Sequence, residues 1–333
     1  MRWLKRMFIL LIVLGVAVGG GYVYWHAQLT APIALKQDTL YEVERGDSVH
    51  HVLDELASRN VIDHVWPYQL LGILEPERLS KLRAGEFKLT PDMNAYQLLA
   101  KLSSNDVVTY QLTIPEGRTF AEMRRLIDEA PKLTHETAGL SDEALMTRLG
   151  HGDEAPEGRF FPSTYRYHKG TSDLVLYRQA YQHMHDVLAK TWEKRQEGLP
   201  LDNAYQALIL ASLIEKETGA PEERREIAGV FVRRLERGMR LQTDPTVIYG
   251  LGNAYDGSLT RADLTQATAY NTYVIDGLPP TPIALPGLAA LEAAVNPKQG
   301  DSLYFVSKGD GHHHFSSTLA EHNAAVRRYI LNR

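Results

Sequence analysis

The sequence predicts an α+β protein in three parts: a single N-terminal transmembrane helix, a small α+β module, and a larger mixed α/β domain. Three observations predict this. A cationic start precedes an uncharged apolar run, short strand-like and helix-like segments alternate over residues 39–104, and longer helical segments with loops and short strands fill residues 105–333. With 333 residues, 44% of them hydrophobic, the chain is long enough for two or three domains.

The N-terminus has the pattern of a membrane anchor. Residues 1–6 form a cationic tail, and residues 7–25 carry no charge. As a helix, this run would be roughly 28 Å long, close to the hydrocarbon core of about 30 Å. Because Lys and Arg stay on the cytoplasmic side, we expect a single-pass protein of the cytoplasmic (inner) membrane with its N-terminus inside. Everything after Trp25 would then be periplasmic or extracytoplasmic. A cleaved signal peptide is the alternative, although no A-x-A site follows the run.

Composition excludes some classes of function. The chain has no Cys, so it contains no disulfide and no thiolate metal site. The chain has a formal net charge of −5, and Arg2, Lys5 and Arg6 of the tail are among its cations, so the remainder is more acidic still. A nucleic-acid binder would instead carry a basic surface. Three adjacent histidines, residues 312–314, cannot easily ligate one metal together, and no i, i+4 His pair supports a zinc site. We therefore expect no cofactor and no metal.

After a predicted tether at residues 26–38, residues 39–104 form the predicted module. A strand at 40–43 leads through the turn Arg45-Gly46-Asp47-Ser48 into a helix at 49–58, because Ser is a favoured N-cap. A helix at 66–74, a strand at 84–89 and a helix at 96–102 follow. The order of strand, turn, two helices and strand resembles a LysM module, which binds N-acetylglucosamine-containing glycans. A generic α+β spacer is the alternative.

The predicted catalytic domain, 105–333, begins with a strand at 107–114 and continues mainly as helices. The remainder from 239 to 304 is rich in Gly, Pro, Thr and Tyr and predicts loops with short strands. A strand at 303–307 and a closing helix at 318–331 end the chain. The helices between these parts are expected at 120–129, 142–149, 174–196, 203–218 and 221–237.

The helix at 203–218 carries the candidate catalytic group. It is apolar nearly all round until Glu215 and Glu217, which indicates a buried helix. These two side chains point roughly 200° apart, so they cannot act together on one bond. Glu215 follows a stripe of mostly small residues, which leaves room for a groove and for a desolvated, raised pKa. Glu217 follows a bulkier stripe suited to packing. Simple capping of the helix end by both glutamates is the alternative.

Polar and aromatic loops after this helix are candidates for sugar recognition. Amide, hydroxyl and phenol groups can bond sugar hydroxyls, and aromatic rings can stack on pyranose faces. Ordinary loop packing explains any one of them equally well. The candidate substrate or supporting contacts are Gln242, Thr243, Asp244, Tyr249, Asn271 and Tyr273.

Several motifs carry a resemblance that covers nearly the whole chain. They are EGRFFPSTY (157–165), ASLIEKET (211–218), MRLQTDPTVIYG (239–250), SLTRADL (258–264), AYNTY with GLPPTPIALPG (269–287), LYFVSKGDGHHHFS (303–316) and EHN (321–323). With them the chain resembles the YceG-like family of membrane-anchored endolytic murein transglycosylases. The resemblance implies one catalytic glutamate at Glu215, places His314 near the cleft, and suggests penicillin-binding proteins or other wall synthases as partners.

The implied reaction needs one carboxyl group. The acid protonates the oxygen between N-acetylmuramic acid (MurNAc) and N-acetylglucosamine (GlcNAc), and the muramyl C6 hydroxyl attacks intramolecularly. The 1,6-anhydro end that results would end nascent peptidoglycan strands. Two alternatives stay open at this stage. One is a hydrolytic muramidase with Asp244 as second carboxylate, and the other is a non-catalytic peptidoglycan-binding scaffold of the wall-synthesis machinery.

Overall fold

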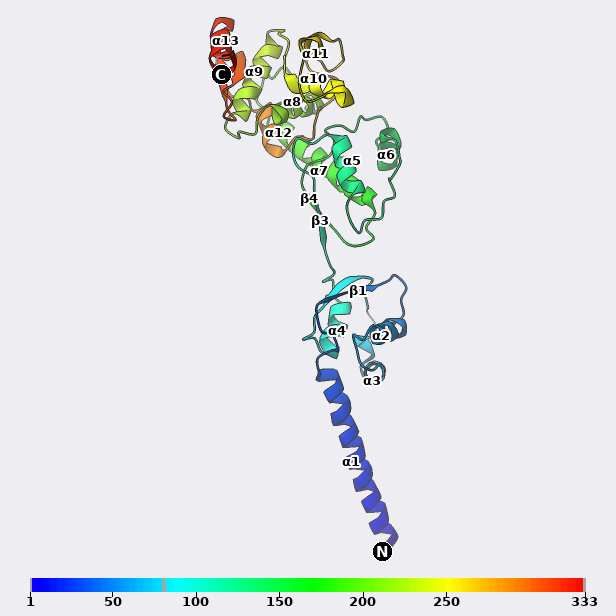
Figure 1. Cartoon of the computed structure of the whole chain (residues 1–333). Coiled ribbons are helices and arrows are strands. Elements are labelled where there is room, and N and C mark those ends of the chain that lie inside the picture. The colour runs from blue at the N-terminus through cyan, green and yellow to red at the C-terminus, as the bar shows by residue number, and fades with distance from the viewer. Residues whose placement is uncertain (1, 80–81, 332–333) are drawn as a thin grey trace. The chain divides into compact units, whose positions relative to one another are not determined.

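The computed structural model describes residues 2–79 and 82–331 and divides into two compact units (Figure 1). Unit 1 comprises Met1–Tyr110 and Tyr167–Gly170, and unit 2 comprises Gln111–Arg166 and Thr171–Arg333. The predicted mixture of helices and short strands is confirmed. Positions 1, 80, 81, 332 and 333, which the predicted tail, module and catalytic domain include, lie outside the described residues.

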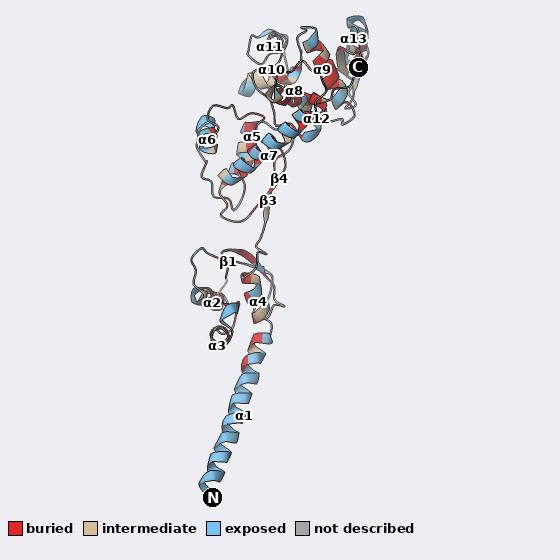
Figure 2. Ribbon diagram, turned by 180° about the vertical axis from the view of Figure 1, so that it is seen from behind, coloured by how far each residue is buried: buried red, intermediate tan, exposed pale blue. Residues whose placement is uncertain are grey.

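Helix α1 (Arg2–Thr30) is longer than the predicted span. Among the described residues it is the one helix long and apolar enough to cross a membrane. Figure 2 shows it exposed along most of its length, with buried positions at its C-terminal end. There Trp25 and Leu29 enter the core of unit 1, and Trp25 Nε1 donates to Pro67 O at 3.0 Å. The first part of the predicted tether is therefore helical and packed, because its apolar side chains share one face with Trp25.

The rest of unit 1 has the predicted order of elements. Strand β1 (Thr39–Val43) pairs antiparallel with β2 (Gly85–Leu89), and Tyr41 faces Phe87 across the pair. Both rings are buried in a core shared with the helices. Between and after the strands come α2 (Val49–Ser58), α3 (Trp66–Leu74), the 3-10 turn η1 (Pro76–Arg78) and α4 (Ala95–Leu102). The likeness to LysM remains a prediction.

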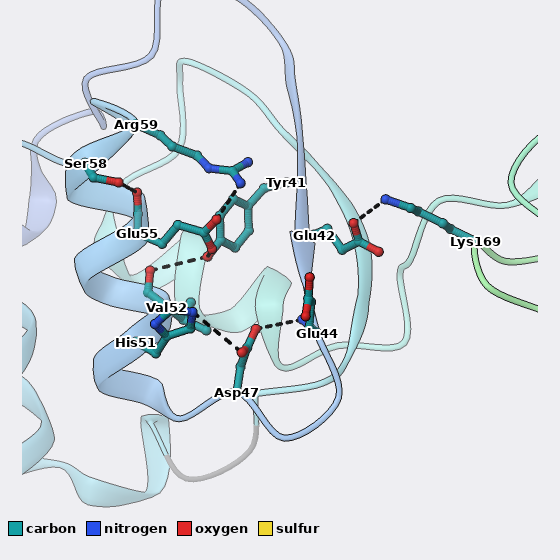
Figure 3. A network of polar contacts seen from close by, with 10 residues as sticks. All are labelled: Tyr41, Glu42, Glu44, Asp47, His51, Val52, Glu55, Ser58, Arg59 and Lys169. Atoms are coloured by element: carbon teal, nitrogen blue, oxygen red, sulfur yellow. Dashed lines mark hydrogen bonds and ion pairs between the residues drawn. The ribbon is translucent and has the colours of Figure 1, made fainter.

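Polar contacts hold the turn between β1 and α2 (Figure 3). Asp47 accepts the Glu44 amide at 2.8 Å, and Ser48 caps α2 by accepting the His51 amide at 3.2 Å. One turn after His51 in α2, Glu55 accepts the Tyr41 hydroxyl at 2.8 Å. The predicted GD-S turn and N-cap are thus both confirmed.

Unit 2 is mainly helical. Strands β3 (Tyr110–Thr113) and β4 (Thr164–Tyr167) form one two-stranded sheet, and all of their residues except Tyr110 and Tyr167 belong to unit 2. The predicted helices are found as α5 (Phe120–Asp128), α6 (Asp142–Leu149), α7 (Asp173–Glu193), α8 (Ala204–Glu217) and α9 (Arg224–Glu236).

The region predicted as loops contains helices instead. In α10 (Asp244–Leu251) a Pro occupies the first turn, where its missing N–H costs nothing, and α12 (Leu288–Val295) is rich in Ala and Leu, which favour helix. A strand was also missed: β6 (His313–Ser316) pairs antiparallel with β5 (Tyr304–Ser307). The remaining elements are η2 (Gly252–Ala254), α11 (Arg261–Thr265), α13 (Leu319–Val326) and the π-helical η3 (Arg327–Leu331).

Helix α8 is the centre of the unit 2 core. Every residue from Ala207 to Ile214 is buried, and α7, α9, α10 and α12 all contact it. A helix buried on all sides can expose functional side chains only at its ends. This places Glu215 and Glu217 where the helix leaves the core.

The packing of Trp25 is testable. We expect Trp25→Ala to destabilise unit 1 by about 3–5 kcal/mol, because it empties a large buried site and removes the hydrogen bond from the indole to the Pro67 carbonyl. Val23→Ala is the control, since Val23 is exposed on the same helix. Urea unfolding of the full chain in detergent, followed by limited proteolysis within residues 39–104, measures the effect. Equal unfolding midpoints for the two variants would show that α1 does not contribute to the module's stability.

Candidate active site

The buried part of α8 is tied to the loop at 282–287. Asn203 caps the helix by accepting the Gln206 amide at 3.0 Å. One turn before the C-terminal end, Ser212 Oγ accepts the Ile283 amide at 3.0 Å, and the Ser212 side chain is fully buried. The loop therefore follows the end of α8 closely, and its last residue, Gly287, reaches Glu215.

Glu215 is held by groups from three segments. Its Oε2 accepts the Gly287 amide at 3.0 Å, and its Oε1 lies 3.9 Å from Arg224 Nη2 at the start of α9. Only 7% of the side chain is exposed. Gly287 is the N-cap of α12, so the Glu215 carboxylate also lies where a helix N-terminus favours negative charge.

The third segment is the loop at 115–118. A Cβ added at Gly287 would lie 1.9 Å from Glu116 Oε1, so the missing side chain makes room for a second carboxylate beside Glu215. The Lys216 ammonium anchors the same loop by donating to Gly117 O at 3.2 Å. Glu116, Arg224 and Gly287 could not be identified from the sequence, because they belong to three other segments that only the fold brings to Glu215.

These surroundings raise the pKa of Glu215. Burial is the main cause; the Gly287 amide lowers the pKa, Glu116 raises it, and Arg224 and Lys216 lower it. The expected direction of the shift is confirmed. A carboxyl with a raised pKa suits a general acid near neutral pH.

Glu217 faces a different cavity, of about 530 Å³. The sequence predicted a packing role for it, but its carboxylate accepts the Thr243 hydroxyl, and burial raises its pKa to about 7. The cavity brings together four of the predicted contact residues, since Gln242, Thr243, Asp244 and Tyr273 all line it. They surround Glu217 rather than Glu215.

The walls of this cavity are firmly connected. Gln242 has a φ of +53°, a conformation uncommon for a residue with a side chain, and its amide donates to Thr272 O at 3.1 Å. The Tyr273 hydroxyl donates to Asp244 Oδ1 at 2.6 Å. Polar side chains that are already hydrogen-bonded offer a preorganised surface to a sugar.

Tyr249 and Asn271 do not line this cavity. Tyr249 donates to Glu157 Oε2 at 3.1 Å. Asn271 is fully buried, and its side-chain amide donates to three backbone carbonyls, those of Asp263, Leu264 and Gln266. Its amide is occupied within the protein, so Asn271 shapes the loop and Tyr249 supports Glu157.

Glu157 is a buried carboxyl that sequence reasoning did not single out. It is 7% exposed and accepts the Phe120 amide at 2.9 Å, so it caps α5. Burial raises its pKa to about 7, against hydrogen bonds from Phe120 and Tyr249 that lower it. The following Gly158 has a φ of +78°, and a Cβ there would lie 2.5 Å from Pro282. Glu157 and Gly158 are the first two residues of the EGRFFPSTY motif, and this Glu-Gly pair is the sequence pattern from which the buried carboxyl could have been predicted.

Among the histidines, His313 rather than His314 lines the cavity. His313 Nδ1 lies 2.8 Å from Glu223 Oε2, whereas His314 is exposed and its ring lies beside Tyr329. His314 does not line the cavity that Glu217 faces, and its position near a substrate cleft stays a prediction. Successive side chains of a strand point to opposite faces, and the unpredicted strand β6 puts His314 on the outer face.

One group of possible metal ligands converges in the described part of the chain: Asp128, His135 and Asp173. The buried Asp173 carboxylate already accepts the Glu136 and Thr137 amides and the Thr137 hydroxyl. These bonds explain its burial without an ion.

Comparison with known proteins decides the family. Residues 41–328 match the model of the YceG-like family. The chain belongs to the YceG-like family. The resemblance carried by the sequence motifs is thus confirmed over most of the protein.

Relatives of this YceG-like chain have a common name. The endolytic murein transglycosylase of Bacillus subtilis (strain 168) is 30% identical, over 95% of this chain and 92% of the relative. That of Streptococcus pneumoniae serotype 2 is 26% identical over 96% of this chain, which spans 64% of the longer relative. A crystal structure of a yceG-like protein from Listeria monocytogenes, 30% identical, superposes with a TM-score of 0.54 and covers 87% of this chain and 100% of its own.

The raised pKa of Glu157 predicts how stability depends on pH. A carboxyl whose pKa is higher in the folded than in the unfolded state stabilises the fold below the unfolded value, and that stability is lost as pH rises through about 7. Wild type should therefore lose about 2–3 kcal/mol more than Glu157→Gln between pH 4.5 and 7.5. Urea unfolding across this range measures it.

Glu122→Gln is the matched control. Burial opposes ionisation of Glu122, but hydrogen bonds from Thr119 and Arg118 outweigh it and lower its pKa. Because its pKa is lowered from an ordinary 4.5, Glu122 titrates below the measured range, so this variant and wild type should have nearly parallel curves between pH 4.5 and 7.5. Parallel pH curves for wild type and Glu157→Gln would contradict the prediction.

Proposed function

We propose that this chain is an endolytic murein transglycosylase, a lyase that cleaves the MurNAc–GlcNAc bond of peptidoglycan without water. The observation that carries the proposal is the Glu215 carboxyl, which is 7% exposed, has a raised pKa and contacts Gly287 and Arg224. Two named relatives and the family match support it. Glu215 is suited to both halves of a lytic reaction, and the neighbouring Glu116 helps to raise its pKa.

In the proposed reaction, Glu215 first acts as acid and then as base. The protonated carboxyl gives its proton to the glycosidic oxygen as the bond to the muramyl C1 breaks. The C6 hydroxyl of the same muramyl residue then attacks C1, and its proton returns to Glu215. The products are a free GlcNAc hydroxyl and a 1,6-anhydro-MurNAc end. The Gly287 amide fixes Oε2 throughout, and Arg224 stabilises the carboxylate while it lacks the proton.

We propose that glycan also binds in the cavity that Glu217 faces, on the side of α8 away from Glu215. The cavity at Gln242, Thr243, Asp244 and Tyr273 offers hydroxyl, amide and carboxylate groups suited to sugar units. An enzyme that cuts within a strand must hold glycan on both sides of the cut. Support for an extended binding surface comes from the position of this cavity at the same helix end as Glu215.

A hydrolytic muramidase is the second candidate. Glu217 and Asp244 line one cavity, and the charge of Asp244 helps to raise the pKa of Glu217. An acid with a raised pKa beside a second carboxylate is the arrangement of hydrolytic glycosidases. In that case Glu217, not Glu215, would be the acid.

The proposed location is the outer face of the cytoplasmic membrane. The apolar part of α1 would span the bilayer with the cationic tail inside. Unit 1, as a LysM-like module, would hold the glycan. Nascent strands emerge at this face, so cleavage there would end their elongation beside penicillin-binding proteins.

Replacing single carboxylates separates the two candidates. Glu215→Gln keeps the Gly287 contact but removes the transferable proton, and we expect cleavage of purified glycan strands to fall at least 1,000-fold, within the range of about 10²–10⁴ for general acid–base catalysis. Glu217→Gln is the matched control and should keep activity within about tenfold. The opposite ranking would transfer the catalytic role to Glu217.

Product mass tests the reaction type. A lytic cut leaves 1,6-anhydro ends that are one water lighter than hydrolytic ends. We expect mass spectrometry of a digested, defined strand to show only the lighter ends, because the C6 hydroxyl replaces water as nucleophile. Reducing ends as the main product would favour the hydrolytic mechanism, and no cleavage by the full chain in detergent would favour a scaffold.

A further inference from the structure

A cavity of about 670 Å³ lies among α7, α9 and α12 in unit 2, and neither candidate reaction places a ligand in it. Its volume is in the range of about 300–1,000 Å³ typical of ligand sites. Its lining joins the C-terminal half of α7, the first turn of α9 and the exposed side of α12.

Positive charge dominates the lining. Lys190, Lys194, Arg224 and Arg225 face Glu292 alone among acidic groups. Arg225 Nε donates to Asn296 O at 2.8 Å, which fixes its position. In residues 2–79 and 82–331, Lys194 has no ion-pair partner. Arg224 Nε is buried without a hydrogen-bond partner in the same part of the chain, a costly arrangement that a bound acceptor would relieve.

Most of the rest of the lining is apolar, apart from Thr191 and Asn296. Ala293 and Thr191 are buried, and Leu288 is 44% exposed. A ligand that fits must therefore combine aliphatic groups with several carboxylates. The single Glu292 adds a place for one cationic group.

The cavity adjoins Glu215 directly. Arg224 belongs to its lining and also lies 3.9 Å from Glu215 Oε1. Leu288, another lining residue, follows Gly287, whose amide binds the same carboxylate. A group in this cavity would thus lie next to the bond that Glu215 protonates.

We propose that this cavity binds the stem peptide attached to the MurNAc residue at the cut, through the carboxylates of that peptide. The proposal rests on the proposed function and adds its substrate class: glycan that still carries stem peptides. The stem peptide is a short chain of alanine and glutamate residues with a diamino acid, so it offers methyl groups, free carboxylates and one amino group. These match the apolar floor, the four cations and Glu292 in turn.

Cleavage of two substrates tests the proposal. Strands with stem peptides and the same strands stripped by an amidase are digested by full-length protein in detergent. For Lys190→Ala/Lys194→Ala we expect kcat/KM to fall about tenfold on peptide-bearing strands, because two charge contacts are lost. On stripped strands it should change less than twofold. Arg178→Ala is the control, since Arg178 is an exposed cation of α7 outside the cavity and should affect neither substrate.

A binding measurement keeps the test independent of catalysis. A fluorescent stem peptide, free of sugar, should bind Glu215→Gln protein, and Lys190→Ala/Lys194→Ala in that background should weaken binding about tenfold. Equal loss of cleavage on both substrates, or unchanged peptide binding, would overturn the proposal. If wild type cuts neither substrate while peptide binding still depends on the lysines, the proposed function fails and the peptide site stands.

Discussion

The chemistry of this protein depends on a helix that has no exposed side until its last turn. Because α8 is buried from Ala207 to Ile214, its rotation is fixed by packing on all sides. The Ser212 bond to Ile283 then sets the path of the loop that ends at Gly287. A turn of α8 by one residue, about 100°, would break that bond and separate Glu215 from the Gly287 amide. The position of Glu215 is thus a consequence of the core.

The same helix end supplies two carboxylates to two unlike environments. Around Glu215, burial and Glu116 favour the protonated form, while Gly287, Arg224 and Lys216 favour the ionised form. Such opposed influences suit a group that must release a proton and then take it back, because neither state is strongly trapped. Glu217 has Thr243 as its hydrogen-bond donor and Asp244 as a repelling neighbour. Among the described residues, no cation lowers the pKa of Glu217, although Arg234 lines the same cavity.

The sequence could predict the features that depend on residues within one helix, but not the contacts between separate segments. The apolar pattern of α8 and its small-residue stripe act within one helix, so the helix and the preference for Glu215 could be predicted locally. Arg224, Gly287 and Glu116 could not, because they come from three other segments brought together by tertiary packing. Strand β6 and helix α12 were missed since short elements among Gly, Pro and His carry weak patterns. Without β6, His313 and His314 could not be assigned to faces.

The N-terminal helix links anchoring to the fold more tightly than a tether would. Trp25 ends the uncharged run and is also a core residue of unit 1, hydrogen-bonded to Pro67. One side chain therefore marks both the end of the proposed membrane span and the beginning of the module. With no free segment between them, unit 1 must lie next to the membrane surface if α1 crosses the bilayer. Aromatic side chains are common at that depth, and Tyr24 stacks on the exposed Trp66 there.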